Sequence, residues 1–374
     1  MNPALRVPFF DRSRGDAALE PELTAAYQRV IRSGHYIQGP EVLAFEQAAA
    51  ARLAVPHAIG VSAGTDALVV ALHAIGVGPG DEVACPVYTF FATVGAVLRV
   101  GATPVLVDVE PEGLTMDPAA LAARIGPHTR AIVPVHLFGR AADLDAIARV
   151  AGSIPIVEDA AQAFGASHRG RPLGSIGAVG CFSLFPTKNL GGFGDGGLVV
   201  THDAAIAERA RALRGHGMIE KHVATLAGGG NYRLDAMNAA LLGVTLPHLD
   251  AKLARRRAIA ERYHGALRGL ASLGLPSFPE GASVNQYVVR VRGEGARDRQ
   301  KSFLAERGVG TEIYYPRPLH LQPTLASLGY REGDFPVAEA ASRETLALPI
   351  FPELREDEID HVITSLAASF ERGR

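Results

Sequence analysis

The sequence predicts an α/β fold built around a parallel sheet, followed by a smaller α+β domain. Over the first two-thirds of the chain, short and almost continuously apolar runs alternate with helical patterns. Strands buried on both faces have this character, and helices cover both faces of such sheets. After residue 245 the elements become shorter and mixed. We therefore expect a large α/β domain over residues 1–245 and a small C-terminal α+β domain over residues 246–374.

Length and composition are those of a globular protein and exclude several classes of function. The chain has 374 residues, 48% of them hydrophobic, and a net charge of -2. No basic stripe is available for nucleic acid, and no apolar run is long enough to span a membrane. Cys85 and Cys181 lie in apolar runs, which favours core packing over metal binding or a disulfide. The N-terminus does not resemble a signal peptide, so we expect a cytoplasmic protein without a metal site.

The elements of the large domain follow one another as strand, loop and helix. Pro40 marks the start of the first clearly delimited helix. The predicted strands are residues 58–61, 82–85, 104–107, 131–135, 154–159 and 198–201. The predicted helices between them are residues 62–75, 91–100, 118–124, 143–150 and 204–213. Because ligands bind beyond the carboxyl ends of the strands in such sheets, residues at those ends are candidates for a site.

The last third of the chain is predicted to contain one long helix and a small mixed unit. Residues 228–233 are too rich in glycine for a regular element, and residues 234–269 are mainly helical with a break near Pro247. Such a long helix often bridges two domains. The elements predicted after it are a strand at 286–291, a helix at 298–307, a strand from 311 leading into a proline-rich loop at 320, and a helix at 356–372.

One lysine stands in the centre of the glycine-rich stretch 181–197. The stretch begins as an apolar strand and ends as a turn; Lys188 lies between the two, with Ser183 five positions earlier. Glycine permits tight turns and close approach of the backbone, so a lysine held there is displayed for chemistry. Phosphate binding and Schiff-base formation are the two common uses of such a lysine. A surface lysine in a flexible hairpin is the structural alternative.

The spacing around Lys188 disfavours the nucleotide-binding loops. A P-loop places its glycines before the lysine and Ser or Thr directly after it, whereas Asn189 follows Lys188. Gly192, Gly194 and Gly197 form a G-x-G-x-x-G pattern. That fingerprint must open a helix, but residues 198–201 are predicted to be a strand, so a dinucleotide site is disfavoured.

Three further groups lie where predicted strands end and should therefore converge. Gly64 and Thr65 open a helix after a strand, and free N–H groups at such a terminus bind anions, although a simple N-cap would use the same geometry. Phe90 follows the second strand. Asp159 closes the fifth, where a buried carboxylate requires a positive partner. The structural alternative for that partner is an arginine or a helix N-terminus in a salt bridge, and the functional one is a protonated ring nitrogen of a cofactor.

Eight short motifs, in order along nearly the whole chain, resemble the DegT/DnrJ/EryC1/StrS family of pyridoxal-phosphate sugar aminotransferases. The first four are residues 34–40 (Gly-His-Tyr-Ile-Gln-Gly-Pro), 62–68 (Ser-Ala-Gly-Thr-Asp-Ala-Leu), 88–93 (Tyr-Thr-Phe-Phe-Ala-Thr) and 158–163 (Glu-Asp-Ala-Ala-Gln-Ala). The others are residues 182–191, 194–197 (Gly-Asp-Gly-Gly), 231–234 (Asn-Tyr-Arg-Leu) and 315–322. Each motif is weak alone, but eight in register make chance resemblance improbable.

The resemblance implies an aspartate-aminotransferase-like fold of type I, with a mostly parallel seven-stranded sheet in the large domain, and pyridoxal phosphate as the cofactor. Lys188 looks like the Schiff-base lysine that also carries the proton, and Asp159 would pair with the pyridinium nitrogen. The other implied cofactor contacts are Phe90 on the ring face, Gln162 near the 3-hydroxyl, Gly64, Thr65 and Ser183 at the phosphate, and Asn231 at the phosphate from the neighbouring subunit.

The resemblance also implies a reaction and an assembly. An amino group would pass from L-glutamate to a keto sugar linked to a nucleotide, in the biosynthesis of amino sugars, polysaccharides or glycoconjugates. Active sites would be shared across a homodimer. Tyr314, Tyr315 and His320 match the family's loop near the sugar pocket; for His320, a packing or capping role is the alternative.

The same motifs favour amination at C3 of the sugar over C4. Relatives that act at C4 often carry His-x-x-Lys and Gly-Glu-Gly-Gly, whereas this chain has Phe185 before Lys188 and Gly-Asp-Gly-Gly at 194–197. A keto-inositol (cyclitol) aminotransferase of the same family is an alternative. A sugar dehydratase would have histidine in place of Lys188, and a non-catalytic regulatory relative would be expected to lack Lys188, Asp159 or Asn231.

Overall fold

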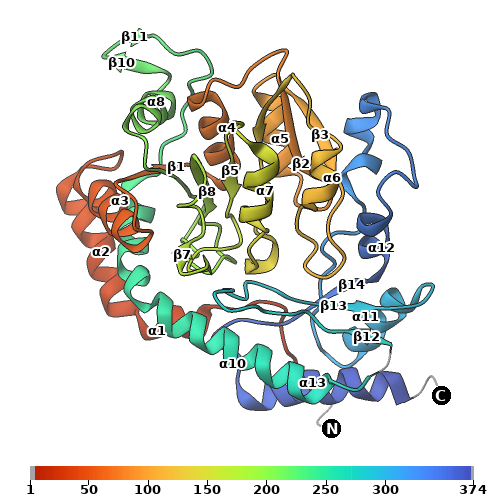
Figure 1. Ribbon diagram of the computed structural model, residues 1–374. Helices are drawn as coiled ribbons and strands as arrows, with labels where there is room; N and C mark the ends of the chain where they lie inside the picture. The colour runs from red at the N-terminus through yellow and green to blue at the C-terminus, as the bar shows by residue number, and fades with distance from the viewer. Residues whose placement is uncertain (1–4, 271, 372–374) are drawn as a thin grey trace.

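The computed structural model describes residues 5–270 and 272–371, and its centre is a twisted sheet (Figure 1). One part of the sheet has the strand order β1-β9-β8-β5 and the other β3-β2-β4. Parallel bridges from Ile132 to Ile156 and from Val135 to Asp159 join the two parts, which gives seven strands. The strands are β1 His57–Val61, β2 Glu82–Pro86, β3 Thr103–Val107, β4 Thr129–Ile132, β5 Val157–Asp159, β8 Val179–Ser183 and β9 Gly197–Thr201.

The sheet is mostly parallel, and β9 is the exception. Strands β2, β3, β4, β5 and β8 pair in parallel, whereas β9 runs antiparallel to both β1 and β8. The glycine-rich segment 184–196, which contains Lys188 and no helix, joins β8 directly to β9, its antiparallel neighbour. The mostly parallel α/β architecture predicted from the sequence is confirmed.

Helices cover both faces of the sheet, as the near-continuous apolar strands predict. Ile59, Cys85 and Val199 face one layer of helices, and their neighbours Ala58, Ala84 and Val200 face the other. The first layer comprises α4 Gly64–Ala74, α5 Ala92–Arg99 and α8 Ala204–Arg214. The second comprises α2 Glu20–Ser33, α3 Pro40–Arg52, α6 Pro118–Ala122, α7 Leu144–Ala151 and α9 Ala236–Thr245.

The C-terminal part has its own apolar core around a second, antiparallel sheet. Its strands are β12 Leu273–Gly274, β13 Tyr287–Val291 and β14 Thr345–Leu348. Its helices are α10 Leu249–Leu267, α11 Ala296–Glu306, α12 Pro336–Glu344 and α13 Glu356–Glu371. A short 3-10 turn at Leu246–His248 separates α9 from α10, which is the break predicted near Pro247. The domain boundary between residues 245 and 246 stays a prediction.

Several elements differ from the expectation. The strand predicted from residue 311 is wrong: Glu312 makes a single bridge to Ala347, and the chain then turns into the 3-10 helix Leu319–Leu321. Pro316 and Pro318 cannot donate ladder hydrogen bonds, which explains why no strand forms. The final predicted helix reaches Arg372, which lies outside the described residues.

Other elements were not predicted at all. These are α1 Ser13–Ala18, α2, α12, β12, β14, and the pairs β6 Ser167–His168 with β7 Arg171–Pro172 and β10 Met218–Glu220 with β11 Val223–Ala224. The β10–β11 hairpin projects from the body of the molecule at the upper left of Figure 1. Within the described ranges, no helix combines the length and apolarity needed to cross a membrane.

Candidate active site

A cavity of about 350 Å³ lies beyond the carboxyl ends of the parallel strands. Nine residues that were singled out from the sequence line it: Gly64, Thr65, Phe90, Asp159, Gln162, Ser183, Lys188, Tyr314 and Tyr315. They come from the ends of β2, β5 and β8, the start of α4, and the loop before the 3-10 helix at Leu319–Leu321. Thr93, Asp195 and Gln286 also line the cavity and were not predicted as site residues.

Lys188 is held in a turn that folds back on itself. Its backbone N–H donates to the carbonyl of Phe185 at 2.9 Å, and the N–H of Gly192 donates to that of Leu184 at 2.7 Å. A side chain at Gly191 would lie 2.3 Å from the carbonyl oxygen of Pro186, so this position requires glycine. Burial lowers the pKa of the Lys188 ammonium to about 8, although the negative charge of Asp159 opposes the shift. A fraction of the amine is therefore free near neutral pH.

Two side chains from distant parts of the chain fix the turn after Lys188. Arg12 donates from Nη1 to the carbonyls of Gly191 at 3.1 Å and Gly192 at 2.7 Å, and its guanidinium stacks 4.3 Å from the ring centre of Phe193. Asp16 holds Arg12 in place through two hydrogen bonds of 2.7 and 2.9 Å. Asn238 of α9 accepts from the N–H of Phe193 and donates to the carbonyl of Asp195.

Asp159 ends β5 with its carboxylate buried. It accepts hydrogen bonds from the Thr93 hydroxyl at 2.8 Å and from the N–H of Ala161 at 3.2 Å. Burial raises the pKa of Asp159, while these hydrogen bonds and the charge of Lys188 counteract the rise. The described residues place no arginine in hydrogen-bond contact with this carboxylate, so the structural ion pair considered from the sequence is not formed with arginine.

The neighbouring carboxylate, Glu158, has a different environment. Its side chain is fully buried and accepts from His136 Nε2 at 2.9 Å and from the backbone N–H groups of Gly174, Ile176 and Gly177 at 2.6–2.7 Å. Nδ1 of His136 accepts from the N–H of Ala142, so Nε2 carries the proton that is donated to Glu158. Burial raises the pKa of Glu158, but these hydrogen bonds outweigh it, and the pKa is lowered overall. Glu158 therefore ties β5 to the loop at residues 174–177.

The N-terminus of α4 forms an open cradle beside Ser183. Ala63 occupies the N-cap position and has no side chain that could cap the first N–H groups. A Cβ at Gly64 would lie only 2.6 Å from Cβ of Ser183, so glycine is needed for helix and strand to approach this closely. Uncapped N–H groups at the positive end of a helix, with a hydroxyl alongside, suit a phosphate group. The residues present therefore fit a phosphate-bearing cofactor.

Gln162 and the neighbouring tyrosines, Tyr314 and Tyr315, form one wall of the cavity. Gln162 accepts from the N–H of Phe138 at 2.7 Å and donates to the Tyr315 hydroxyl at 3.1 Å. Tyr88 supports Tyr315 from behind by accepting from its N–H at 2.9 Å. Burial raises the pKa of Tyr315, which keeps its phenol neutral. Phe90 is 60% exposed at the cavity, which leaves its ring face available to a ligand.

Two predicted site residues do not line this cavity. Asn231 is exposed, and its side chain has no hydrogen bond to any described residue. His320 is buried, its Nε2 lies 3.1 Å from Oε1 of Glu339, and its ring packs on Phe335. Within one chain, these contacts favour the packing role that was the alternative for His320. A cross-subunit role for Asn231 stays a prediction.

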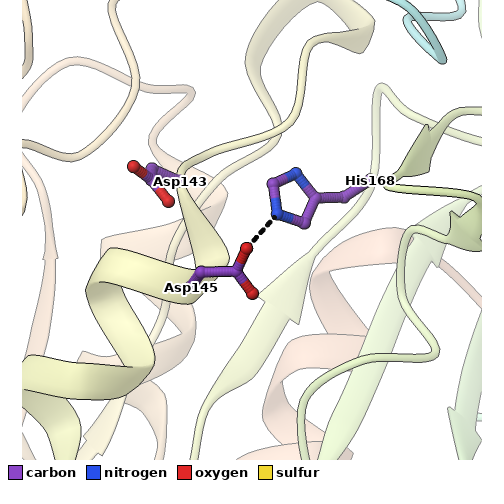
Figure 2. A group of neighbouring side chains, drawn as sticks. All are labelled: Asp143, Asp145 and His168. Carbon is purple, nitrogen blue, oxygen red and sulfur yellow. Dashed lines mark hydrogen bonds and ion pairs between the residues drawn. The ribbon is translucent and has the colours of Figure 1, made fainter.

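One group of potential metal ligands occurs among the described residues, at Asp143, Asp145 and His168 (Figure 2). Asp143 caps α7 by accepting from the N–H of Ala146. Asp145 pairs with His168 at 3.1 Å and with two arginines, Arg169 at 3.0 Å and Arg171 at 3.8 Å. Because two guanidinium groups already balance Asp145, the group is an ion-pair network and does not favour a cation. None of its members lines the cavity that contains Lys188.

The fold and the site fit an enzyme with a phosphate-bearing cofactor. A lysine and a buried carboxylate line the same cavity as the uncapped N-terminus of α4, at the edge of an α/β sheet. The chain belongs to the DegT/DnrJ/EryC1/StrS aminotransferase family, whose sequence model matches residues 18–367. It is an aminotransferase. This confirms the resemblance seen in the motifs.

Relatives cover nearly the whole chain. A dTDP-3-amino-3,4,6-trideoxy-alpha-D-glucose transaminase of Streptomyces venezuelae is 44% identical over 98% of this chain and 97% of its own length. A pleiotropic regulatory protein of Geobacillus stearothermophilus is 43% identical over 97% of this chain and 98% of its own. The relatives thus include a transaminase that acts on a nucleotide-linked sugar and a protein named for regulation.

Solved structures match the fold closely. The S. venezuelae protein DesV, in complex with a ketimine intermediate, has a TM-score of 0.94 and 44% identity over 98% of this chain and 99% of its own. The protein ntda from Bacillus subtilis, with its bound cofactor PMP, has a TM-score of 0.92 and 29% identity over 98% of this chain and 85% of its own.

Proposed function

We propose that this aminotransferase uses pyridoxal phosphate to move an amino group from L-glutamate to a keto sugar linked to a nucleotide, at C3 rather than C4. The observation that carries the proposal is the convergence of Lys188, Asp159 and the open N-terminus of α4 on one cavity. The ntda structure, which contains PMP, and the sugar named for the S. venezuelae transaminase support it. The 3-amino group in that name supports C3.

Six residues that line the cavity have a task in holding the cofactor. Gly64, Thr65 and Ser183 would bind the phosphate, and Asp159 would keep a proton on the ring nitrogen. Phe90 would cover the ring, and Gln162 would lie near its 3-hydroxyl. When bound, pyridoxal phosphate supplies an aldehyde that condenses with primary amines and a ring that accepts electron density.

Lys188 would perform the proton transfer. Its amine, with a pKa of about 8, is free often enough to take a proton from the α-carbon of the donor and to return one during amination of the sugar. Tyr315 and Gln162, which hydrogen-bond each other, would fix the wall against which the substrates pack and help to exclude water. Tyr314 and Tyr315 are the proposed sugar contacts in this chain.

We further propose a homodimer in which Asn231 completes the phosphate site of the partner subunit. The exposed position of Asn231, outside its own chain's cavity, supports this assignment. A mixture of Lys188→Ala and Asn231→Ala proteins tests it, because mixed dimers would contain one intact site. Recovery of activity on mixing two inactive variants is expected, and its absence would count against shared sites.

The substrate is tested by a screen. Purified holoprotein is incubated with L-glutamate and dTDP-, UDP- or GDP-linked 3-keto and 4-keto sugars, and with a keto-inositol, and the products are identified by mass. We expect a nucleotide-linked 3-amino sugar. Amination of the keto-inositol alone would instead support the cyclitol alternative, and no amination of any of these acceptors would count against a nucleotide-linked keto sugar as the substrate.

A further inference from the structure

Gln286 lines the active-site cavity and carries a buried, unpaired hydrogen-bonding atom; the same residue also lines a second cavity, of about 380 Å³. It precedes β13 in the small C-terminal part, and its Oε1 is buried without a hydrogen-bond partner among the described residues. Several other buried side-chain atoms also lack partners, but of the residues that carry them only Gln286 lines this cavity. A buried acceptor without a partner is costly, so its presence in a binding cavity points to a ligand.

Gln162, a second glutamine that lines the same cavity, has hydrogen-bond partners at both ends of its amide. Gln162 uses its oxygen to accept from Phe138 and its nitrogen to donate to Tyr315, so both ends of its amide are occupied within the protein. No such partner is supplied to Oε1 of Gln286. The two amides therefore differ: Gln162 is fully paired within the protein, whereas Gln286 lines the same cavity with its amide oxygen unpaired.

The backbone holds Gln286 in place independently of its side chain. The N–H of Asn285 donates to the carbonyl of Phe138 at 2.9 Å, and the N–H of Gln286 approaches the same carbonyl at 3.5 Å. Phe138 is the residue whose own N–H is bound by Gln162. Gln286 is thus anchored to the same backbone segment as the brace formed by Gln162 and Tyr315.

The charges of the cavity indicate which kind of group Gln286 receives. The charged residues that line it are Lys188, Asp159 and Asp195, and no arginine is among them. A carboxylate could bind only the N–H side of the amide and would share the cavity with the carboxylates of Asp159 and Asp195. A hydroxyl can either donate to Oε1 or accept from Nε2, so it satisfies the amide in either orientation.

We propose that Gln286 binds a hydroxyl group of the sugar acceptor and not a carboxylate of the amino donor. This inference rests on the proposed function, since it requires a hydroxyl-rich acceptor. It makes Gln286 a residue that distinguishes the two substrates, which enter the same cavity in turn. Its position directly before β13 would give the small C-terminal part a direct contact with the sugar.

The test separates the two halves of the reaction in the holoprotein. The donor half is the 2-oxoglutarate released by L-glutamate alone, and the acceptor half is the amination of a dTDP-linked 3-keto-6-deoxyhexose by protein preloaded with pyridoxamine phosphate. Gln286→Leu and Gln286→Met are compared with the wild type. Asn285→Leu is the matched control, because Asn285 is also a buried amide without side-chain partners but does not line the cavity.

We expect both Gln286 variants to lose roughly 10- to 100-fold in kcat/KM of the acceptor half while the donor half stays within about twofold. Their Tm without substrate should be unchanged or higher, because an unpaired acceptor is removed. An equal loss in both halves, a loss confined to the donor half, or an unchanged acceptor half would each overturn the proposal. The wild-type reaction with the keto sugar tests the proposed function separately.

Discussion

The hydroxyl of Thr93 donates a 2.8 Å hydrogen bond to the buried carboxylate of Asp159. Burial raises the pKa of the Asp159 carboxyl, and this hydrogen bond lowers it. The bond therefore helps to keep Asp159 ionised, as pairing with a protonated ring nitrogen would require. Thr93 lies in the first turn of α5, and its N–H donates to the carbonyl of Phe90 at 3.3 Å, so it links the cavity-lining Phe90 to the buried acid.

Thr93→Val removes this hydrogen bond while nearly preserving shape. Hydrogen bonds to charged groups contribute about 1.5–3 kcal/mol, so we expect kcat/KM to fall roughly 10- to 100-fold. The pKa of Asp159 should rise further, so the loss should be largest toward acid pH. The measurement is the pH profile of kcat/KM. Thr89→Val, which removes only the contact between Thr89 and Thr93, is the control, and an acid limb identical to that of the wild type would contradict this role.

Lys188 should make the free energy of unfolding of the apoprotein depend on pH in the alkaline range. Burial lowers the pKa of Lys188 from 10.5 to about 8, so between these values the unfolded chain binds more protons than the folded one. The free energy of unfolding should therefore rise with pH across this window. Urea unfolding of the apoprotein at pH 7 to 10 measures it, and in Lys188→Met the rise should be smaller. Parallel curves for both proteins would rule out the lowered pKa.

Arg12 should act as a positioning residue for the lysine turn. Arg12→Ala removes two hydrogen bonds to the carbonyls of Gly191 and Gly192 and the stacking on Phe193. We expect kcat to fall roughly tenfold, with a shift in the pH at which the visible absorbance of the holoprotein changes. Arg14→Ala is the matched control, since Arg14 pairs with Glu358 and does not touch the turn. If the two variants behaved alike, the effect would be one of general stability.

Glu158 should matter more for stability than for chemistry. Glu158→Gln leaves some of its four donors without a charged acceptor, which we expect to cost about 1.5–3 kcal/mol in the free energy of unfolding. Because the folded-state pKa of Glu158 is lowered, its stabilising contribution is present above its unfolded pKa and is lost as the pH falls. The variant should therefore show a weaker acid dependence of stability, measured by denaturant unfolding at pH 3 to 7. A full loss of activity at unchanged stability would contradict this assignment.

The parts of the fold that were predictable are those governed by local patterns. The apolar runs at residues 82–85 and 104–107 are buried on both faces, and Pro40 begins α3 as expected. The prediction of a strand from residue 311 was wrong because it gave more weight to the apolar residues than to the prolines that follow them.

The site residues that were predictable lie in short motifs next to strand ends. Lys188, Asp159 and Gly64 each stand at such a position, and the structure brings them to one cavity. Arg12 and Gln286 were not predicted, because their roles depend on contacts across more than a hundred residues of chain. His320 occupies a motif position, but it packs against Glu339, a residue that no local pattern connects to it.

The most direct test of the account is to identify the residue that forms the covalent bond to the cofactor. The chain contains four lysines, Lys188, Lys221, Lys252 and Lys301, so borohydride reduction of the holoprotein followed by peptide mass mapping can distinguish them. We expect a phosphopyridoxyl group on Lys188 and its loss from this site in Lys188→Ala. A phosphopyridoxyl group on another lysine, or none on a holoprotein that still aminates a keto sugar, would contradict it.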